Sequence, residues 1–410
     1  MKRRALIAAV PGAVAALAGC GGGGGGDFAS VGSGGTGITG GEGVGSGGTG
    51  ITSAAVGAIT GFGSIIVNGV RYETDQAALT LSDSDTLKLG MTVRVRGVIN
   101  PDLVSGVAST IESSVDARGP VAALDLANAT LVLWYTKIHT DDSTVFAGGL
   151  MSLQDLRVGD PVQVWGLPDS GTGLRATRIE RAAAGAPPII SGTAQAVDVS
   201  TSSVQVGGLR VAFTPDALAS AGLTPAQLEG RLVRVRGTEA DATITQAAVE
   251  PWYPVTPADG ERLSVEGLIT RFTSLASLQV DGVPVDASAA KISGRQDSIG
   301  QGARVQIEGA WRAGVLVASR LKLREPAQSG DSSGPGSGGD QDDDYSARGN
   351  IGAFRSASDF KIQGQDINAG GTGVVFVNGT SANLGNGRRV FVTGSRVVND
   401  QLVAERVEFL

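Results

Sequence analysis

A short strand pattern that recurs five times constrains the fold of this chain more than any other feature. Each copy has two aliphatic residues that alternate with polar or aromatic ones and then a closing glycine. The copies end at Gly97, Gly166, Gly237, Gly309 and Gly394. Alternation with a period of two is typical of a strand that buries one face. Recurrence at a fairly regular spacing indicates copies of one structural unit.

Other sequence features recur at the same spacing as this strand. A glycine followed five residues later by a large apolar residue opens every copy, as in the pair Gly57 and Phe62. Two-residue hairpin signals follow in three copies, at Asn68-Gly69, Gly207-Gly208 and Asp281-Gly282. A further alternating strand closes each copy. Because a small sheet with one apolar face must curl or pair to bury it, we expect an all-β fold of five tandem, small antiparallel barrels of the OB type.

These landmarks divide the chain into consecutive regions. The boundaries are a leader at 1–19, a glycine-rich tether at 20–52, module 1 at 53–114, module 2 at 115–183, module 3 at 188–251, module 4 at 260–325, an acidic Ser/Gly linker at 326–345 and module 5 at 346–410. Short helical turns are expected at 152–156 and 224–228, the second because Thr224 can cap a helix that begins with Pro225.

The N-terminus has the features of a lipoprotein leader. Three cations at residues 2–4 precede a short apolar stretch, which is typical of a signal peptide. Leu17-Ala18-Gly19-Cys20 is similar to a bacterial lipobox, and Cys20 is the only cysteine. We therefore expect lipidation of Cys20 and attachment to a membrane through that lipid. Gly21, by its resemblance to the same position in Gram-negative lipoproteins, favours the outer membrane. More than half of residues 21–52 are glycine, so this tether is expected to be disordered.

The repeated motifs also point to a known family. The run from Ile59 to Val70, the five strands that end in glycine and the closing strands of the form V-x-A-x-x-I-E together resemble the bacterial domain-of-unknown-function family 5666. The resemblance covers about residues 53–325 and 346–410, and it is strongest in module 1. It implies small β modules on exported proteins, and it supplies no activity and no catalytic residues.

Composition excludes several kinds of chemistry. The formal net charge is −7, and removal of the cationic leader would make the chain more negative, so nucleic acid is not an expected partner. A single cysteine excludes an intrachain disulfide. With His139 as the only histidine, zinc sites built from several thiolates or imidazoles are excluded as well. We expect no cofactor and no bound metal.

Three short motifs formally match catalytic or ligand-binding patterns, but their context argues against each. Gly330-Asp-Ser-Ser-Gly334 has the spacing of a nucleophile elbow, yet it lies in a Ser/Gly/Pro-rich linker. Gly43, Gly45 and Gly48 match a dinucleotide fingerprint, yet no strand precedes them. The acidic residues from Asp340 to Asp344 begin like a calcium loop, but Tyr345 stands where glycine is required.

His139 is expected to be a solvated residue at the end of a strand, since no partners for a catalytic role are identifiable. The paired acids Asp83/Asp85 and Asp141/Asp142 fall among turn residues, where aspartate commonly makes local hydrogen bonds.

Five residues are candidates for ligand contact. Arg94, Arg96, Arg234 and Arg236 occupy the polar positions of two equivalent strands, and Trp165 takes the same outward position in module 2. An outward basic patch could meet anionic envelope sugars, and an exposed Trp could stack on a sugar ring. The same charges could equally serve only to keep the sheets soluble.

Two neighbouring aromatic residues, Trp252 and Tyr253, are instead expected to pack between modules. From the sequence we expect a non-enzymatic, lipid-anchored envelope protein that binds or spaces envelope components. A module specific for a carbohydrate or a protein is the alternative, and a hydrolase is a remote one.

Overall fold

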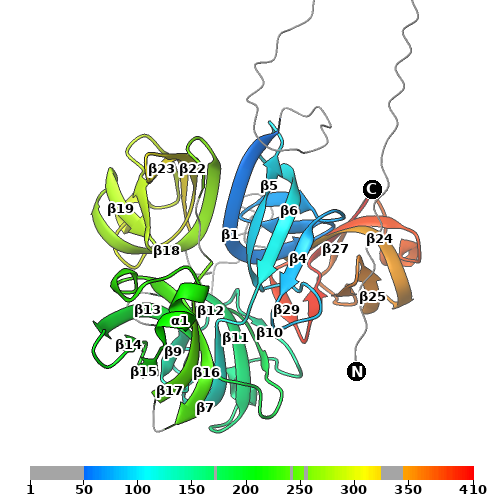
Figure 1. Ribbon diagram of the computed structural model, residues 1–410. Helices are drawn as coiled ribbons and strands as arrows, with labels where there is room; N and C mark the ends of the chain where they lie inside the picture. The colour runs from blue at the N-terminus through cyan, green and yellow to red at the C-terminus, as the bar shows by residue number, and fades with distance from the viewer. Residues whose placement is uncertain (1–49, 170–172, 241–242, 254–256, 325–344) are drawn as a thin grey trace, which may run out of the picture. The chain divides into compact units, whose positions relative to one another are not determined.

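The computed structural model describes residues 50–169, 173–240, 243–253, 257–324 and 345–410. Nearly all regular structure in these ranges is β-strand, which confirms the all-β expectation (Figure 1). Cys20, the leader, almost all of the tether and nearly all of the acidic linker lie outside the described residues, as do the three motifs at 43–48, 330–334 and 340–344. Within the described ranges, no helix has the length and apolar character needed to cross a membrane.

Module 1 shows the pairing scheme of the chain. Its strands are β1 (Ile51–Phe62), β2 (Ile65–Val67), β3 (Val70–Glu73), β4 (Ala78–Leu81), β5 (Thr92–Ile99) and β6 (Ser105–Ser113). β1 pairs antiparallel with β2 and with β5, β2 pairs with β3, and β5 pairs with β6. β6 then runs parallel to β3 and β4. The pairs therefore return to their starting strand, in the order β1-β2-β3-β6-β5-β1.

The other four modules repeat this cyclic order. Module 2 has β7 (Ala117–Asp125), β8 (Thr130–Leu133), β9 (Thr136–His139), β10 (Val145–Phe146), β11 (Pro161–Pro168) and β12 (Leu174–Arg181). Module 3 has β13 (Ile189–Asp198), β14 (Ser203–Val206), β15 (Leu209–Ala212), β16 (Leu232–Ala240) and β17 (Thr243–Pro251).

The strands of the last two modules continue the numbering. Module 4 has β18 (Arg262–Ser274), β19 (Ser277–Val280), β20 (Val283–Asp286), β21 (Lys291–Ser293), β22 (Arg304–Arg312) and β23 (Val315–Leu323). Module 5 has β24 (Tyr345–Ser356), β25 (Asp359–Ile362), β26 (Gln365–Asn368), β27 (Val375–Val377), β28 (Arg389–Gly394), β29 (Arg396–Val398), β30 (Gln401–Val403) and β31 (Arg406–Phe409). In one respect the pairing differs from expectation, because each module contains parallel pairs that involve its closing strand.

The expected helical turns are present. The 3-10 turn η1 (Leu153–Asp155) has Ser152 as its N-cap, and η2 (Pro225–Gln227) has Thr224 as its N-cap. Two further 3-10 turns are η3 (Gln296–Ser298) and η5 (Ser381–Asn383). The α-helix α1 (Pro215–Ser220) is capped by the Thr214 hydroxyl.

In modules 1, 2, 4 and 5 the glycine that opens the module faces the tip of its first hairpin. All five hairpins have two-residue turns, including Trp134-Tyr135, which lacks the usual turn residues, and Gln363-Gly364, which has glycine only at its second position. The first turn residue has a positive φ in every case, and the side chain of Asn68 packs over Gly57. A Cβ on Gly57 would lie 2.2 Å from Asn68 Oδ1, so a side chain there would displace the Asn68 amide.

The glycine that closes the repeated strand is required for a different reason. At Gly97 the partner strand approaches so closely that a Cβ would lie 2.1 Å from the carbonyl oxygen of Val107. Gly309 and Gly394 meet the backbone of their closing strands in the same way, at 2.1 and 2.0 Å. The pairing register shifts immediately before Gly97 and Gly309, as expected of a β-bulge. The repeated glycine therefore marks a point where two backbones come into contact.

The modules also contact one another through their first strands. Ser53–Val56 of β1 pairs parallel with Arg262–Val265 of β18, and Gly61 and Phe62 pair parallel with the start of β24. Each of modules 2, 3 and 4 has its own cluster of buried aliphatic residues, whereas one cluster extends over modules 1 and 5. Neighbouring modules therefore cover strand faces that the sequence pattern alone assigns to solvent.

Candidate functional site

Trp165 does not lie on the surface, so the expectation of an exposed ring is wrong. Its side chain is only 1% exposed and belongs to the apolar cluster of modules 1 and 5. The guanidinium of Arg178 lies 5.9 Å from the ring centroid. The reason is that module 1 covers this side of β11, where the Thr92 hydroxyl donates a hydrogen bond to the carbonyl of Gly166. A tryptophan in this position cannot stack on a sugar.

The predicted arginines do not form an outward basic patch either. Arg94 forms an ion pair with Glu112. Arg234 is buried, and Arg236 is largely covered, with 27% of its side chain exposed. Arg96 is partly buried on the same strand as Arg94. Neighbouring modules supply carboxylates for Arg234 and Arg236, so the expectation of outward charge is wrong for these two residues.

Asp83 connects the first three modules. Its carboxylate accepts hydrogen bonds from Arg118 at 2.7 Å and from Arg236 at 2.7 Å. It also accepts the Ser114 hydroxyl and the Val115 backbone N–H, at 3.0 and 3.1 Å. Burial alone would raise the pKa of Asp83, but the two arginines outweigh burial and hold this pKa well below its usual range.

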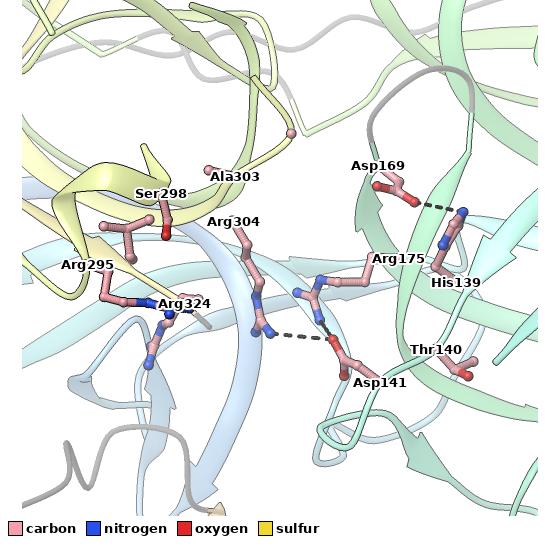
Figure 2. Close-up of a pocket in the computed structure, with 12 residues that line it drawn as sticks. His139, Thr140, Asp141, Asp169, Arg175, Arg295, Ser298, Ala303, Arg304 and Arg324 are labelled. Atoms are coloured by element: carbon pink, nitrogen blue, oxygen red, sulfur yellow. Dashed lines mark hydrogen bonds and ion pairs between the residues drawn. The ribbon is translucent and has the colours of Figure 1, made fainter. Parts of the chain in front are cut away.

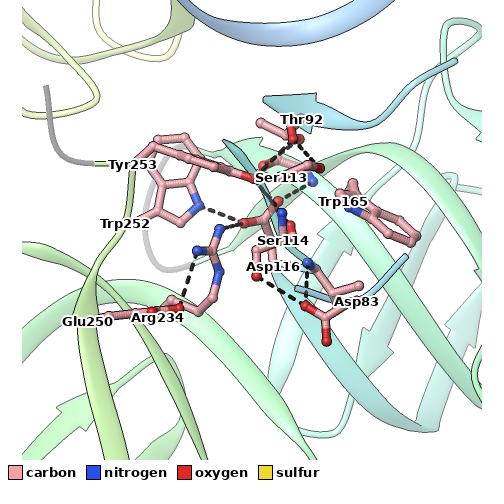
Figure 3. Close-up of polar contacts among 12 residues, drawn as sticks. Asp83, Thr92, Ser113, Ser114, Asp116, Trp165, Arg234, Glu250, Trp252 and Tyr253 are labelled. Atoms are coloured by element: carbon pink, nitrogen blue, oxygen red, sulfur yellow. Dashed lines mark hydrogen bonds and ion pairs between the residues drawn. The ribbon is translucent and has the colours of Figure 1, made fainter. Parts of the chain in front are cut away.

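Asp116 is the centre of a second buried network, which Figure 3 shows beside Asp83. Its carboxylate accepts hydrogen bonds from Arg234 at 2.6 Å, from Trp252 Nε1 at 2.8 Å and from the Gly166 N–H at 2.9 Å. Burial raises the pKa of Asp116 against the effect of these donors. Burial would lower the pKa of Arg234, but Asp116 outweighs it and the pKa is raised.

Trp252 and Tyr253 pack between modules, as the sequence predicts. Both are more than nine-tenths buried. The Tyr253 hydroxyl donates a hydrogen bond to the carbonyl of Thr92 at 3.0 Å, and its ring lies under the Arg234 guanidinium at 4.7 Å. Trp252 and Tyr253, which follow module 3, thus connect modules 1 and 2 to module 3 through hydrogen bonds and aromatic contacts.

A pocket of about 450 Å³ opens between modules 2 and 4 (Figure 2). The titratable side chains that line it are His139, Asp141, Asp169, Arg175, Arg295, Arg304 and Arg324, and Thr140 and Ser298 add two hydroxyl groups. Residues from β9 and β12 form one wall, and β22, η3 and the end of β23 form the other. The expected position of His139 at a strand end is confirmed, and its Nε2 lies 3.2 Å from a carboxylate oxygen of Asp169.

A ring of four charged residues joins the two walls of this pocket. Arg304 lies 2.7 Å from Glu266 and 3.5 Å from Asp141. Arg175 lies 3.3 and 3.4 Å from the same two carboxylates. Burial would raise the pKa of Glu266, but Arg304 and Arg175 outweigh it and lower this pKa to about 2. Both carboxylates are therefore ionised at neutral pH and hold the guanidiniums at the pocket.

The sequence did not reveal the acidic members of these networks. Asp83 and Asp141 look like ordinary turn residues, and Asp116 and Glu266 carry no motif. In the part of the chain that the structure describes, no group of three or more His, Cys, Asp and Glu side chains is arranged to hold a metal ion. The lining combines four guanidiniums and one imidazole with the carboxylates of Asp141 and Asp169, and its excess of guanidinium donors suits an oxygen-rich, anionic ligand.

Comparison with known proteins agrees with the repeat pattern. The family described as Domain of unknown function (DUF5666) matches residues 53–112, 118–180, 266–322 and 348–408. None of the curated proteins gives a significant match. Module 3 lies outside the matched segments, although its strands pair in the same cyclic order. Because the four matches cover more than half of the sequence, the chain belongs to the DUF5666 family and carries its domain in tandem copies.

Proposed function

We propose that this chain is a non-enzymatic lipoprotein of the bacterial cell envelope, anchored in the outer membrane through Cys20, whose tandem modules bind or space other envelope components. We also propose that each module is a small barrel of the OB type. The cyclic pairing order supports this architecture, because a sheet whose last pair returns to its first strand leaves no long free edge.

The pocket between modules 2 and 4 is the observation that carries the binding role. Its volume of about 450 Å³ lies in the range of ordinary ligand sites. Residues of two modules line it, so a ligand there would contact both modules at once. Such a site exists only where the two modules are held side by side, as they are in this chain. The guanidiniums at the pocket favour carboxylate or other oxyanion groups. An acidic envelope polysaccharide meets this requirement, and so does a protein with surface carboxylates.

A hydrolase is the second candidate, and one observation favours it. His139 and Asp169 lie within hydrogen-bonding distance, and Ser298 and Thr140 also line the pocket. A histidine paired with a carboxylate is one part of the arrangement that serine hydrolases use. The two candidates differ in one respect that can be measured, because only the hydrolase consumes its ligand.

The test uses the full chain and two pocket variants, Arg295→Gln and His139→Ala. Arg271→Gln is the control, since Arg271 is an exposed arginine of the same module away from the pocket. We expect Arg295→Gln to reduce retention on immobilised envelope polysaccharide or envelope protein extract, and the control to retain it. Hydrolysis of a ligand that disappears with His139→Ala would overturn the non-enzymatic role. Equal retention by all variants would overturn binding in this pocket.

The anchor is tested separately. We expect Cys20→Ser to move the chain from the membrane fraction to the soluble fraction of cells, because the thiol that accepts the lipid is gone. Protease treatment of intact cells then reports on which side of the outer membrane the modules lie. If the Cys20→Ser chain remained in the membrane fraction and detergent released it from there, anchoring through Cys20 would be contradicted.

A further inference from the structure

We infer that a second cleft, between modules 1 and 5, is a binding site for a phosphate group. This cleft has a volume of about 220 Å³, and the side chains that line it are Arg71, Arg348, Asn350, Gln363 and Arg389. It lies on modules that contribute nothing to the pocket of modules 2 and 4. The inference therefore goes beyond the proposed function, and either can fail without the other.

The sheet pairing between the two modules brings these side chains together. Gly61 and Phe62 of β1 pair with Ser346 and Ala347 of β24, and Arg348 is the next residue along that strand. Asn350 and Arg389 are direct partners in the β24–β28 ladder. Arg71 comes from β3, the second strand of the first hairpin of module 1. Three cations from three strands thus reach one cleft.

Two glycines, Gly63 and Gly349, are among the residues that line the cleft. A Cβ on Gly63 would lie 2.2 Å from the carbonyl oxygen of Arg348, and Gly63 has a φ of 114°. A Cβ on Gly349 would lie 3.0 Å from Cγ of Gln363. Because neither position carries a side chain, the backbones on the two sides of the cleft approach closely, and Arg71, Arg348 and Arg389 line the space that remains.

The charge of this cleft is unbalanced. No carboxylate is among the described residues that line it. Elsewhere in the molecule arginines at module boundaries are matched by acids, as Arg118 and Arg236 are matched by Asp83. Within the described ranges, no ion pair is found for Arg71, Arg348 or Arg389, and Arg71 helps to lower the pKa of the exposed Asp102. Like charges held together in this way repel one another, and a bound anion removes that repulsion.

The chemistry of the cleft favours phosphate over a carboxylate. The planar forks of guanidinium groups donate pairs of parallel hydrogen bonds to oxyanions, and a phosphate offers more acceptor oxygens and more charge than a carboxylate. The amides of Asn350 and Gln363 add neutral donors. Such a group can come from a phospholipid headgroup or from free phosphate, and the shared feature is the phosphate itself.

The test measures phosphate binding by the full chain with Cys20→Ser, which removes the lipid but leaves the modules intact. Inorganic phosphate and pyrophosphate are titrated by calorimetry against this protein and against the double variant Arg348→Gln, Arg389→Gln. We expect the double variant to bind at least about a hundredfold more weakly, about tenfold for each arginine, because the phosphate loses the charge-assisted hydrogen bonds of both guanidiniums. Arg396→Gln is the control, since Arg396 is an exposed arginine of module 5 outside the cleft.

A second measurement distinguishes the two possible sources of the phosphate group, a phospholipid headgroup and the free ion. Vesicles of phosphatidylcholine alone and of phosphatidylcholine with phosphatidic acid are sedimented with the same proteins. Binding to the second kind only, lost in the double variant, identifies a lipid headgroup as the source, and binding of free phosphate alone identifies the soluble ion. Absence of binding in both assays, or binding that the double variant retains while its thermal midpoint matches that of the parent, would overturn the inference.

Discussion

The carboxylate of Asp281 packs directly over the backbone of Gly267, where a Cβ would lie 1.8 Å from Asp281 Oδ2. Asn68 holds the same place over Gly57 in module 1. The Asn68 amide donates a hydrogen bond to the carbonyl of Val56 at 3.0 Å, whereas Asp281 accepts the Leu268 N–H at 3.2 Å and its Oδ2 lacks a hydrogen-bond partner in the described structure. Burial raises the pKa of Asp281 well above its ordinary value.

We expect Asp281→Asn to stabilise the protein at neutral pH by about 1–3 kcal/mol, because the buried carboxyl must take up a proton on folding whereas an amide is neutral in both states. In the parent protein the unfolded carboxyl loses its proton near the ordinary pKa of 3.8 while the folded one keeps it. Stability contributed by this group is therefore complete below pH 3.8 and falls as the pH rises toward the raised pKa. Denaturant unfolding at pH 4 and pH 8 measures the difference.

Asn68→Asp is the matched control for this prediction. It creates in module 1 the carboxyl that module 4 already has, so it should lower the free energy of unfolding at pH 8 more than at pH 4. If Asp281→Asn left the free energy of unfolding unchanged at both pH values, the carboxyl would not be a cost to the folded state.

A second prediction concerns the glycine that closes the repeated strand. We expect Gly309→Ala to lower the free energy of unfolding by about 1–3 kcal/mol, because its methyl group would meet a backbone oxygen that cannot rotate away. Gly352→Ala is the control, since no atom lies within 4 Å of a Cβ there. Thermal and denaturant unfolding compare the two. Similar losses for both would mean that the close approach of β22 and β23 is not what requires glycine.

Sequence reasoning succeeded where the signal is local to one module. The alternation in β5 and its counterparts predicted which residues point inward, and Val93 and Val95 are indeed fully buried. It failed for Trp165, because the period of two assigns a residue to one face of a sheet but does not say whether another module covers that face. It also missed the turns at Trp134 and Gln363, where the hairpin geometry of the module overrides local preference.

The same limit explains why the sequence did not predict the residues of the candidate site. Asp83 and Asp85 look equivalent in the sequence, yet only Asp83 lies within reach of Arg118 and Arg236, which come from 35 and 153 residues further along the chain. The pocket is likewise built from two modules that are distant in sequence. The repeat predicted the shared pairing scheme of the five modules, whereas the functional groups at their boundaries depend on positions that no repeat specifies.

A third prediction tests the charged ring at the pocket. We expect Glu266→Gln to cost about 3–5 kcal/mol, because Arg304 and Arg175 would lose a shared buried partner. The pKa of Glu266 is lowered from 4.5 to about 2, so its contribution to stability is present above pH 4.5 and is lost as the pH falls toward 2. Glu308→Gln, which removes the partner of the more exposed Arg320, should cost less than about 1 kcal/mol. Equal losses in urea unfolding would contradict a special role for the ring.

The last prediction concerns the junction of modules 1, 2 and 3. We expect Asp83→Asn to lower the free energy of unfolding at neutral pH, because Arg118 and Arg236 would lose the charge that they share. Since the pKa of Asp83 is lowered, this contribution is present above its ordinary value of 3.8 and disappears as the pH falls below it. A double-mutant cycle with Arg236→Gln should give a coupling energy of about 0.5–3 kcal/mol. Asp85→Asn is the control, since Asp85 is exposed two residues away. A coupling energy near zero, or equal losses for Asp83→Asn and Asp85→Asn, would show that the modules are joined by apolar contacts rather than through this carboxylate.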